Sequence, residues 1–593
     1  MGPNKIEKSY QLCENLNMKF DIDNKIKNLC NTIAEIKPLQ NFLDAFAKHK
    51  FAGENNEIIS PKIYLVGGAV RDVLLDKKFK DYDFVVEGIS KETLKKFLES
   101  VPGKLMDIEG RNFGVFKLKL EDCNLEFIDI ALPRIDIYQE HGLGHKDVQV
   151  KTNQNLTIQD DLGRRDFTIN AMAIDLSARK LIDPFNGLQD LEEKTLKSVG
   201  VPYDRLVKED PTRIMRALRF AAKYDLDIEK NTFDTISKYH HEINKKFSQE
   251  YTNKKGVTKK REIERVSRDI IASEFVKGFY HQPAKMIELL DESGVYQEIF
   301  PPEIIRVWES MKTCDQPENY HSEGSVWNHT MLALKNIDKI YSNDLGIPQE
   351  VDINTKMAVW LHDFGKVDTF RVDEEGNYTY YNHPQVSAEL AAHLFTKMNI
   401  NSLLGESNVY KVNEDQVIFA IENHMLPFGP DVTGMKNNTI VKYYLKIIEP
   451  KTVEFGKSRP TIEMSPEGIS VLQLAYVDAN SSIKKHGPQD FTGLKNMIGK
   501  INQVKQHLEK YDIRTVYPIT GHDLMKVFGN ISQDEKYKDF ARFQKTGGIF
   551  FGDMMDYVLE DALENPSAYQ EKIDYSHLQN VVLRYIEVNG IKP

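Results

Sequence analysis

Apolar and polar residues are patterned differently in two parts of the chain, and the change lies near residue 190. Between about 60 and 185, short apolar runs bounded by Gly, Pro and Asp are typical of strands mixed with helices. They predict strands at 62–66, 82–86, 113–120 and 124–131, and helices near 69–76 and 91–100. The rest of the chain, including residues 1–55, has the pattern of helices joined by short loops. The sequence therefore predicts an α+β protein with a small β-sheet head and mostly helical remaining parts.

A chain of 593 residues is too long for a single hydrophobic core. The strand pattern fades after Pro184, and breaks rich in Pro and Gly lie near 300 and 485. These boundaries predict five parts: an N-terminal helical extension at 1–55, a head at 56–190, a helical neck and body at 191–300, a second helical domain at 301–485 and a helical tail at 486–593.

The composition excludes several classes of protein. No apolar run reaches the roughly 18 residues that a membrane span needs, and the N-terminal residues contain no apolar signal core. The four cysteines are scattered without CxxC spacing, which argues against zinc sites and disulfide frameworks. We therefore expect a cytoplasmic protein in a reducing compartment, with no membrane partner.

The net charge of −11 is not that of a typical nucleic-acid-binding protein. One stretch, residues 245–268, is strongly basic and reads KKFSQEYTNKKGVTKKREIERVSR. Two interpretations remain open for it. It is either the solvated face of a helix–loop–helix, or a contact with a nucleic-acid backbone if other features require a nucleic-acid substrate.

The most informative stretch runs from Tyr64 to Val86 and reads YLVGGAVRDVLLDKKFKDYDFVV. Gly67 and Gly68 follow an apolar strand and allow a tight turn with close approach to a ligand, because neither has a Cβ. Asp81 and Asp83 are two residues apart, so on a strand both carboxylates point to the same face. Paired carboxylates suit Mg²⁺, which bridges substrate phosphates. A glycine turn combined with this pair predicts nucleotidyl transfer.

Three further blocks fit the same chemistry. A third carboxylate is needed to hold two metals in line with the α-phosphate, and Asp129 on an apolar strand supplies it. Arginine forks suit triphosphate oxygens, and candidates are Arg134, Arg164 and Arg165, the last two beside Asp166. In KEDPTRIMRALRF, the residues Asp210, Arg213 and Arg216 are spaced three apart, which predicts one helix face. They either form an intrahelical salt bridge or read the edge of a nucleobase.

The order of these motifs, namely GGAVRD, DxD, RRDFTINAMA and EDPTRIMRALRF, resembles the family of class II tRNA nucleotidyltransferases and bacterial poly(A) polymerases over residues 62–226. The resemblance implies a role for each matching residue. It implies a triphosphate loop at Gly67, Gly68, Arg71 and Asp72, metal-binding and catalytic carboxylates at Asp81, Asp83 and Asp129, a sugar and phosphate block at Arg164, Arg165, Asp166 and Asn170, and a selector of CTP and ATP at Glu209, Asp210 and Arg213.

The resemblance also implies the activity and the partners. The enzyme would build or repair the 3′-terminal CCA of tRNA from CTP and ATP without a nucleic-acid template, with Mg²⁺ in the head. Addition of CC only, of A only, or of poly(A) remains open, and we expect the loop at 135–158 to distinguish these activities. The oligomeric state is open.

A second set of residues after position 320 has a different metal chemistry. Imidazoles and carboxylates recur beside apolar helical runs, and adjacent His362 and Asp363 are chemically odd without a metal. The set is His329, His362, Asp363, His383, His424 and Asp478. Mixed imidazole and carboxylate ligation fits a transition divalent ion such as Ni²⁺, Mn²⁺ or Co²⁺.

This set resembles the HD phosphohydrolase superfamily. The resemblance implies an all-α HD domain with phosphatase and phosphodiesterase activity on 2′-phosphates or 2′,3′-cyclic phosphates. Three alternatives remain: an HD domain that is only structural, an RNA-binding phosphohydrolase whose head does no chemistry, and a non-catalytic RNA-binding protein.

Overall fold

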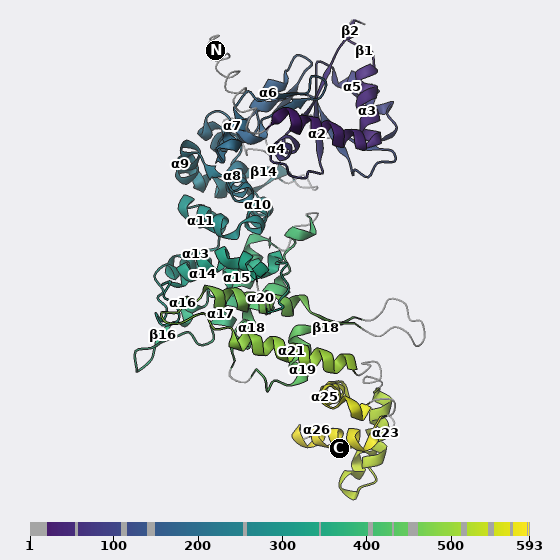
Figure 1. The fold of residues 1–593 in the computed structure, drawn as a ribbon, viewed down its shortest axis with the longest axis vertical. Helices are drawn as coiled ribbons and strands as arrows, with labels where there is room; N and C mark the ends of the chain where they lie inside the picture. Colours follow the sequence, from purple (N-terminus) through teal and green to yellow (C-terminus); the bar gives the residue numbers. More distant parts are fainter. Residues whose placement is uncertain are drawn as a thin grey trace. The chain divides into compact units, whose positions relative to one another are not determined.

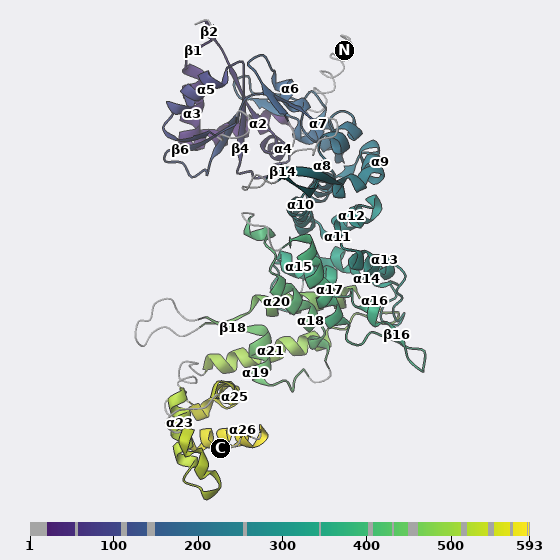
Figure 2. The same cartoon turned by 180° about the vertical axis from the view of Figure 1, so that it is seen from behind.

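The computed structural model describes residues 21–591, except 54–56, 108–114, 139–148, 253–257, 343–344, 401–406, 430–431, 449–460, 511–518, 544–550, 570–572 and 590. The chain forms two compact units (Figures 1 and 2). The first runs to Phe300 and includes the short segment Met398–Leu403, and the second contains the remainder. The predicted breaks near 190 and 485 fall inside these units, so the five-part division remains a prediction.

The first unit is built on one mixed sheet with the strand order β11-β10-β3-β4-β7-β6-β5. Its strands are β3 (Lys62–Val66), β4 (Tyr82–Glu87), β5 (Gly103–Asp107), β6 (Val115–Leu120), β7 (Ile128–Ala131), β10 (Ala173–Asp175) and β11 (Lys180–Ile182). The pair β4 and β7 is parallel, and the other neighbours are antiparallel. Strands were predicted in the regions of β3, β4, β6 and β7, and β5, β10 and β11 were missed.

Three helices pack on the sheet, and the last two contribute aromatic side chains. They are α2 (Ile22–Glu35), α3 (Lys37–Lys48) and α5 (Lys91–Glu99). Phe42 of α3 lies 6.4 Å from Phe84 of β4 and 6.2 Å from Phe97 of α5 between ring centroids. The described N-terminal residues, which were predicted to be helical, therefore pack on the head. Burial of these rings supplies much of the core on this side of the sheet.

A helical region follows the sheet in the same unit. It contains α6 (Ile158–Gly163), α7 (Gly187–Glu192), the π-helix η3 (Asp204–Glu209), α8 (Thr212–Tyr224), α9 (Lys230–Tyr239), α10 (Arg268–His281) and α11 (Pro283–Ser293). Helix α8 is buried on most of its surface. It packs against α10, where a Cβ on Gly278 would meet the Cα of Arg219 at 3.2 Å.

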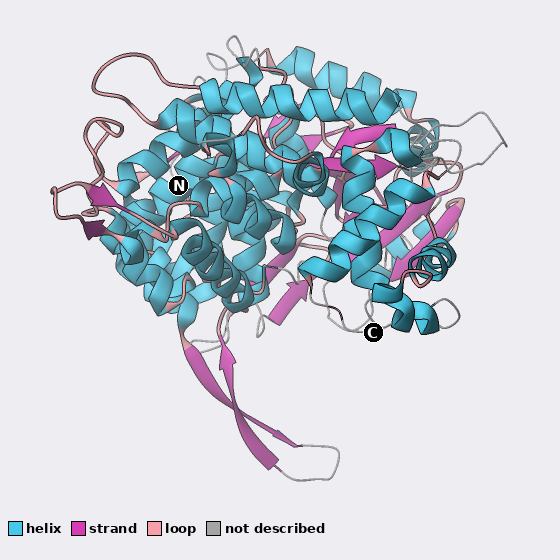
Figure 3. Cartoon of the chain, turned by 90° about the horizontal axis from the view of Figure 1, so that it is seen from below, coloured by secondary structure: helices cyan, strands magenta, loops and turns pink. Residues whose placement is uncertain are grey.

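The basic stretch is not a helix–loop–helix, which corrects one of the two interpretations. It forms the antiparallel pair β14 (Lys246–Thr252) and β15 (Thr258–Glu264), and strands appear in magenta in Figure 3. The two strands pair with each other along their length. The backbone is therefore hydrogen-bonded, and the stretch does not need the apolar face of a packed helix. Arg265 donates to Glu242 at 2.5 Å and to the carbonyl of Val207 at 2.6 Å, so this cation is structural. Lys254 and Lys255 lie outside the described residues.

The second unit is mainly helical. Its principal elements are α13 (Pro302–Met311), α14 (Val326–Asn336), α15 (Ile353–Leu361), α16 (Lys366–Thr369), α17 (His383–Met398), α18 (Glu414–Asn423), α20 (Pro466–Ser481) and α21 (Thr492–Lys510). Trp308 and Trp360 are fully buried at its core, with ring centroids 6.2 Å apart. Two short hairpins, β16 (Arg371–Val372) with β17 (Tyr378–Thr379) and β18 (Leu445–Ile448) with β19 (Thr461–Met464), interrupt the helices.

The C-terminal helices of this unit gather around their own apolar cluster. The elements are α23 (Gly521–Ile531), η9 (Glu535–Arg542), α25 (Phe551–Glu564) and α26 (Tyr575–Val588). Leu524, Phe528, Val558 and Val582 are fully buried in this cluster. A search of the described helices for one with the length and hydropathy of a membrane span finds none.

Gly187 tests how tightly the head is packed. A Cβ there would lie 2.1 Å from the carbonyl oxygen of Thr168, in the short helix η2 (Thr168–Asn170). We expect Gly187→Ala to destabilise the first unit by about 1–3 kcal/mol through overpacking. All three tryptophans belong to the second unit, so thermal unfolding followed by circular dichroism should shift while the tryptophan fluorescence transition stays in place.

The matched control is Gly499→Ala in α21, where a Cβ meets nothing within 4 Å. This variant should unfold like the wild type or slightly later, because alanine favours a helix over glycine. Equal stability of the Gly187→Ala variant and the wild type would show that η2 can move aside.

Candidate active sites

The turn after β3 requires glycine. Gly67 has φ of 72°, in the left-handed region that disfavours residues with a Cβ. A Cβ here would lie 2.8 Å from Nη1 of Arg165 and 3.9 Å from Oδ2 of Asp83. The turn therefore brings bare backbone beside a guanidinium and a carboxylate, which suits a phosphate chain and its counter-ion.

The three predicted carboxylates lie on adjacent positions of the sheet. Asp83 of β4 pairs in register with Asp129 of β7, and Asp81 precedes β4 with the buried Tyr82 between the two aspartates. Burial raises the pKa of Asp83, and the charges of Asp129 and Asp81 raise it further, although Arg165 and Lys117 oppose them. A divalent cation would relieve this repulsion, and an all-oxygen donor set fits Mg²⁺.

Asp83 also lines a cavity of about 620 Å³ with a strongly cationic wall. The cations are Arg71, Arg134, Arg164, Arg165, Arg213, Arg216, Arg219 and Lys223. Gly67, Gly68, Asn170, Asp166 and Asp210 line the same cavity. Guanidinium forks bind phosphate oxygens in pairs. The structure thus gathers most residues of the predicted nucleotide site around one space, and adds Arg219 and Lys223, which the motifs did not indicate.

Two other predicted residues, Asp72 and Glu209, hold arginines in place. Oδ1 of Asp72 accepts from Arg71 at 3.0 Å and from the hydroxyl of Tyr224 at 3.1 Å. Oε2 of Glu209 accepts from Arg205 at 2.7 Å and from Arg213 at 2.8 Å. Neither carboxylate lines the cavity, so their contribution to this site is to orient the guanidinium groups.

Buried carboxylates fix the RRD block. Burial by itself would raise the pKa of Asp166, but Arg216 and Asn170 hold it well below its usual range. Arg216 donates to Asp166 at 2.6 and 3.0 Å. Asp161, which the sequence analysis did not single out, accepts hydrogen bonds from Arg164 at 2.8 Å and from Arg165 at 3.0 Å. Asp161 lies three and four residues before these arginines, a spacing that on a helix predicts ion pairs and could have indicated its role.

Asp210 does not share a helix face with Arg213 and Arg216, which corrects that prediction. It has extended backbone with φ of −151° between η3 and α8. Its Oδ1 accepts from the amide and hydroxyl of Thr212 at 3.0 and 2.7 Å, because Pro211 is the N-cap of α8 and Asp210 lies in front of it. Arg213 is on α8 and donates to Glu209 and to the carbonyl of Arg164 at 3.1 Å.

In the second unit, four imidazoles are oriented by hydrogen bonds at Nδ1. His362, His383 and His424 contact the carbonyls of Val359, Tyr380 and Ile421, each three residues earlier, at 2.9, 3.0 and 2.6 Å. His362 and His424 end α15 and α18, where carbonyls lack helical partners. His329 contacts Glu323 at 2.8 Å through Nδ1. With Nδ1 as the donor, every Nε2 presents a lone pair for a metal.

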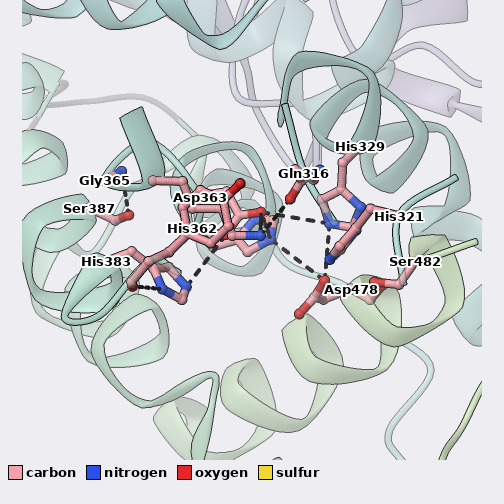
Figure 4. Close-up of polar contacts among 12 residues, drawn as sticks. Gln316, His321, His329, His362, Asp363, Gly365, His383, Ser387, Asp478 and Ser482 are labelled. Carbon is pink, nitrogen blue, oxygen red and sulfur yellow. Dashed lines mark hydrogen bonds and ion pairs between the residues drawn. The ribbon is translucent and has the colours of Figure 1, made fainter. Parts of the chain in front are cut away.

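These Nε2 atoms converge on two aspartates (Figure 4). His329 Nε2 lies 3.0 Å from Asp478 Oδ1, and His362 Nε2 lies 3.3 Å from Asp363 Oδ2. The other oxygen of Asp363 lies 3.6 Å from His383 Nε2, which is 3.3 Å from His424 Nε2. Both {His329, His362, Asp363} and {Asp363, His383, His424} offer ligand atoms within 4.8 Å of one another. Five of the six predicted ligands therefore form two groups that share Asp363, and the sixth, Asp478, joins them through its contact with His329.

The electrostatics of this centre favour bound cations. Burial lowers the pKa of His424 to about 3, and His362 and His383 add to the effect. Burial also lowers the pKa of His329, but hydrogen bonds to Asp478 and Glu323 outweigh it and raise the value to about 9. The neighbouring histidines hold the pKa of Asp363 well below its usual range despite its burial. Neutral imidazoles and ionised carboxylates are the forms that bind metals, so His424 is already in its binding form, whereas a metal at His329 must displace a proton.

Three residues that the sequence analysis missed complete this centre. Glu323 contacts both His329 and His321 at 2.8 Å. Lys366 lies 2.7 Å from Oδ2 of Asp363. Gly365 permits the turn between α15 and α16 to approach the start of α17, because a Cβ would meet the carbonyl oxygen of His383 at 2.4 Å. The run HDFGK contained the last two, but spacing alone does not tell a structural lysine or glycine from a functional one.

Known proteins resemble part of the chain in sequence. Residues 63–197 match the family described as poly A polymerase head domain. A multifunctional CCA protein from Neisseria gonorrhoeae is 32% identical over 308 residues, which cover 52% of this chain and 62% of the relative. One from Dechloromonas aromatica is 31% identical over 311 residues, covering 52% and 63%. The chain thus spans less than two thirds of the length of these relatives.

A solved structure extends the likeness of fold further along the chain. The Bacillus stearothermophilus CCA-adding enzyme in complex with CTP superposes with a TM-score of 0.54 over 93% of this chain and 99% of that one, at 16% identity. The predicted α+β fold class is confirmed. The resemblance carried by the motifs is supported as a similarity: residues 63–197 match the poly A polymerase head domain, and the chain is similar to multifunctional CCA proteins.

Proposed function

We propose that the chain adds nucleotides to the 3′ end of tRNA, building or repairing the terminal CCA from CTP and ATP. The observation that carries the proposal is the register pair of Asp83 and Asp129 beside a cavity lined by arginines. Two similarities support the choice of CTP and ATP as substrates and of CCA as the product. The chain is similar to proteins named multifunctional CCA proteins, and it shares its fold with a CCA-adding enzyme in complex with CTP.

In this proposal the protein groups bind and orient. Arg71, Arg165 and Arg216 hold the triphosphate, and Asp129 accepts the proton of the primer hydroxyl. Asp210 and Arg213 present an acceptor and a donor to the base edge, so that side chains select the nucleotide. Mg²⁺ held by Asp81 and Asp83 would supply charge neutralisation at the phosphates.

Addition of CC only, of A only, or of poly(A) remains an alternative for the same site. The loop at 135–158, which we expect to separate these activities, includes 139–148, outside the described residues. The described residues at the start of this loop contact the proposed nucleotide selector, since the hydroxyl of Tyr138 lies 3.4 Å from Arg213. We further propose a cytoplasmic location, in keeping with the tRNA substrate and with cysteines that form no CxxC pairs.

For the second unit we propose a metal-dependent phosphohydrolase that acts on 2′-phosphates or 2′,3′-cyclic phosphates. The observation behind it is the convergence of four Nε2 atoms on Asp363 and Asp478. A purely structural role is disfavoured because His362 Nε2 is buried without a hydrogen bond, which costs free energy unless a ligand is bound. The mixed donor set fits Ni²⁺, Mn²⁺ or Co²⁺, and such an ion would supply an activated water.

Asp83→Ala should lower nucleotide addition by about a thousandfold or more, because loss of a metal ligand removes several kcal/mol of transition-state stabilisation. Binding of tRNA should stay nearly unchanged. The measurement is incorporation of labelled CTP and ATP, singly and together, into tRNA that lacks its 3′ end. Asp44→Ala, an exposed aspartate on α3, is the control. A variant that keeps a tenth of the wild-type rate would remove Asp83 from the reaction.

The double variant His362→Ala, Asp363→Ala should lose hydrolysis of 2′,3′-cyclic nucleotides and keep CCA addition. The reason is that Asp363 belongs to both ligand groups, whereas the head uses carboxylates of the other unit. His393→Ala is the control, since this imidazole pairs with Glu303 at 3.2 Å away from the centre. If the wild type hydrolyses nothing with Ni²⁺, Mn²⁺ or Co²⁺, the centre is structural. If the double variant also loses nucleotide addition, the activities of the two units are not independent.

Metal binding in the second unit should strengthen as the pH rises from 6 to 9. The pKa of His329 is about 9 in the metal-free protein, so the ion must displace a proton below that pH. We expect the Kd for Ni²⁺, measured by calorimetry, to fall about tenfold per pH unit near pH 7. Glu323→Gln removes a carboxylate that raises this pKa, so its slope should be shallower. A Kd that does not change between pH 7 and 9 would contradict the assignment of His329.

A further inference from the structure

Two tyrosines beside the metal-ligand centre are exposed to an extent that packing does not explain. Tyr320 is 61% exposed and Tyr381 is 83% exposed. Both line a cavity of about 920 Å³ that also contains Asp363, His383 and Asp478. Tyr320 comes from the segment before α14, and Tyr381 lies between β17 and α17. Large exposed rings that converge on one cavity mark a binding surface rather than a core.

The other tyrosines of this cavity have structural partners. The ring of Tyr378 packs edge-on against Phe370 at 5.2 Å between centroids, and the hydroxyl of Tyr380 donates to the carbonyl of Asp315. Tyr320 and Tyr381 differ from them, because neither ring packs against another aromatic ring within the part of the chain that the structure describes. Their faces are therefore available to a flat ligand.

The remaining wall of the cavity suits a phosphate ester. Lys366 and Lys484 line it together with the proposed metal ligands. The ammonium group of Lys366 lies 2.7 Å from Asp363, while that of Lys484 lies 3.9 Å from Asp490. Cations and metal ligands thus share one cavity with free aromatic rings, which matches a ligand that has both a phosphate and a nucleobase.

We propose that Tyr320 and Tyr381 stack on the last bases of a single-stranded RNA and so deliver its 3′-terminal phosphate to the metal centre. This rests on the proposed phosphohydrolase function. A pocket for a free small molecule encloses most of its ligand. Here the two rings stand largely in solvent and come from separate segments, which suits a strand that continues out of the cavity. Stacking of bases on aromatic side chains tolerates any sequence.

The kinetic test compares three esters that share a five-membered cyclic phosphate. They are a short RNA with a 2′,3′-cyclic phosphate end, a 2′,3′-cyclic mononucleotide, and glycerol 1,2-cyclic phosphate, which has no base. Tyr320→Ala and Tyr381→Ala should each raise KM for the RNA about ten- to a hundredfold. The kcat for the RNA and both constants for the glycerol ester should stay within about twofold. An equal loss on all three esters, or no loss on the RNA, overturns the proposal.

Two control variants separate the ring from the hydroxyl and from general surface effects. Tyr320→Phe and Tyr381→Phe should keep the wild-type KM, because they retain the stacking face. Val372→Ala should also be neutral, since Val372 is 55% exposed on the adjacent β16 but does not line the cavity. If the alanine variants raise KM for the mononucleotide as much as for the RNA, the site is a free-nucleotide pocket and the RNA assignment is wrong.

Photo-crosslinking of the full wild-type chain tests the surface without turnover. The probe is the same RNA with a 3′-terminal 5-iodouridine, irradiated in EDTA, and the crosslinked peptides are mapped. We expect Tyr320 or Tyr381 to be labelled, and free 5-iodouridine 2′,3′-cyclic phosphate to label them less. Labelling confined to the first unit overturns the proposal. A wild type that hydrolyses none of the esters while RNA still labels these tyrosines would reject the phosphohydrolase function alone.

Discussion

Like charges held close together are the physical constraint on which both candidate sites depend. In the head, Asp83 and Asp129 face one another across a strand pair, and eight cationic side chains surround the adjoining cavity. In the second unit, the carboxylates of Asp363 and Asp478 share one buried centre with four imidazoles. Such arrangements lose free energy when empty and regain it when an oppositely charged ligand enters. The surrounding structure must therefore be rigid enough to keep the groups from separating.

The two units achieve this rigidity in different ways. In the head, buried carboxylates hold the guanidinium groups: Asp161 binds Arg164 and Arg165, and Asp166 binds Arg216. The arginines are thus preorganised, with part of their charge left for a ligand. In the second unit, backbone carbonyls near helix ends fix the imidazoles through Nδ1. A carbonyl has no net charge, so it orients the ring and selects its tautomer without competing for the metal.

The sequence predicted residue types and local order well, and geometry less well. The strands that carry Asp83 and Asp129 were predicted because β4 and β7 are apolar and bounded by turns. Strands β10 and β11 were missed because three residues are too few for a periodicity. Asp210 was placed on a helix by its spacing from Arg213, but Pro211 between them is the N-cap of α8, so the helix begins only at Thr212. A run of lysines gave no indication of the hairpin, because pairing between β14 and β15 is not visible in the charges.

The ligand set of the second unit was predictable as a list but not as an arrangement. Histidine and aspartate beside apolar helices indicated a metal, since such groups are seldom buried alone. That Asp363 belongs to two ligand groups depends on packing, and in particular on Gly365, which lets the turn after α15 lie against the start of α17. Glu323 was not evident either, because its role is to fix the tautomer of His329, and tautomers leave no trace in a sequence.

The difference between the two donor sets has a consequence for a cell that contains several divalent ions. The head offers carboxylate oxygens, which suit Mg²⁺ and distinguish weakly among transition metals. The second unit offers mostly imidazole nitrogen, for which Mg²⁺ has little affinity and Ni²⁺ or Co²⁺ a strong one. Transition ions would therefore be drawn to the histidines, and abundant Mg²⁺ would fill the head by mass action. In the proposed function one chain thus holds two metal-dependent sites with different ion preferences, because imidazoles are ligands only in the second unit.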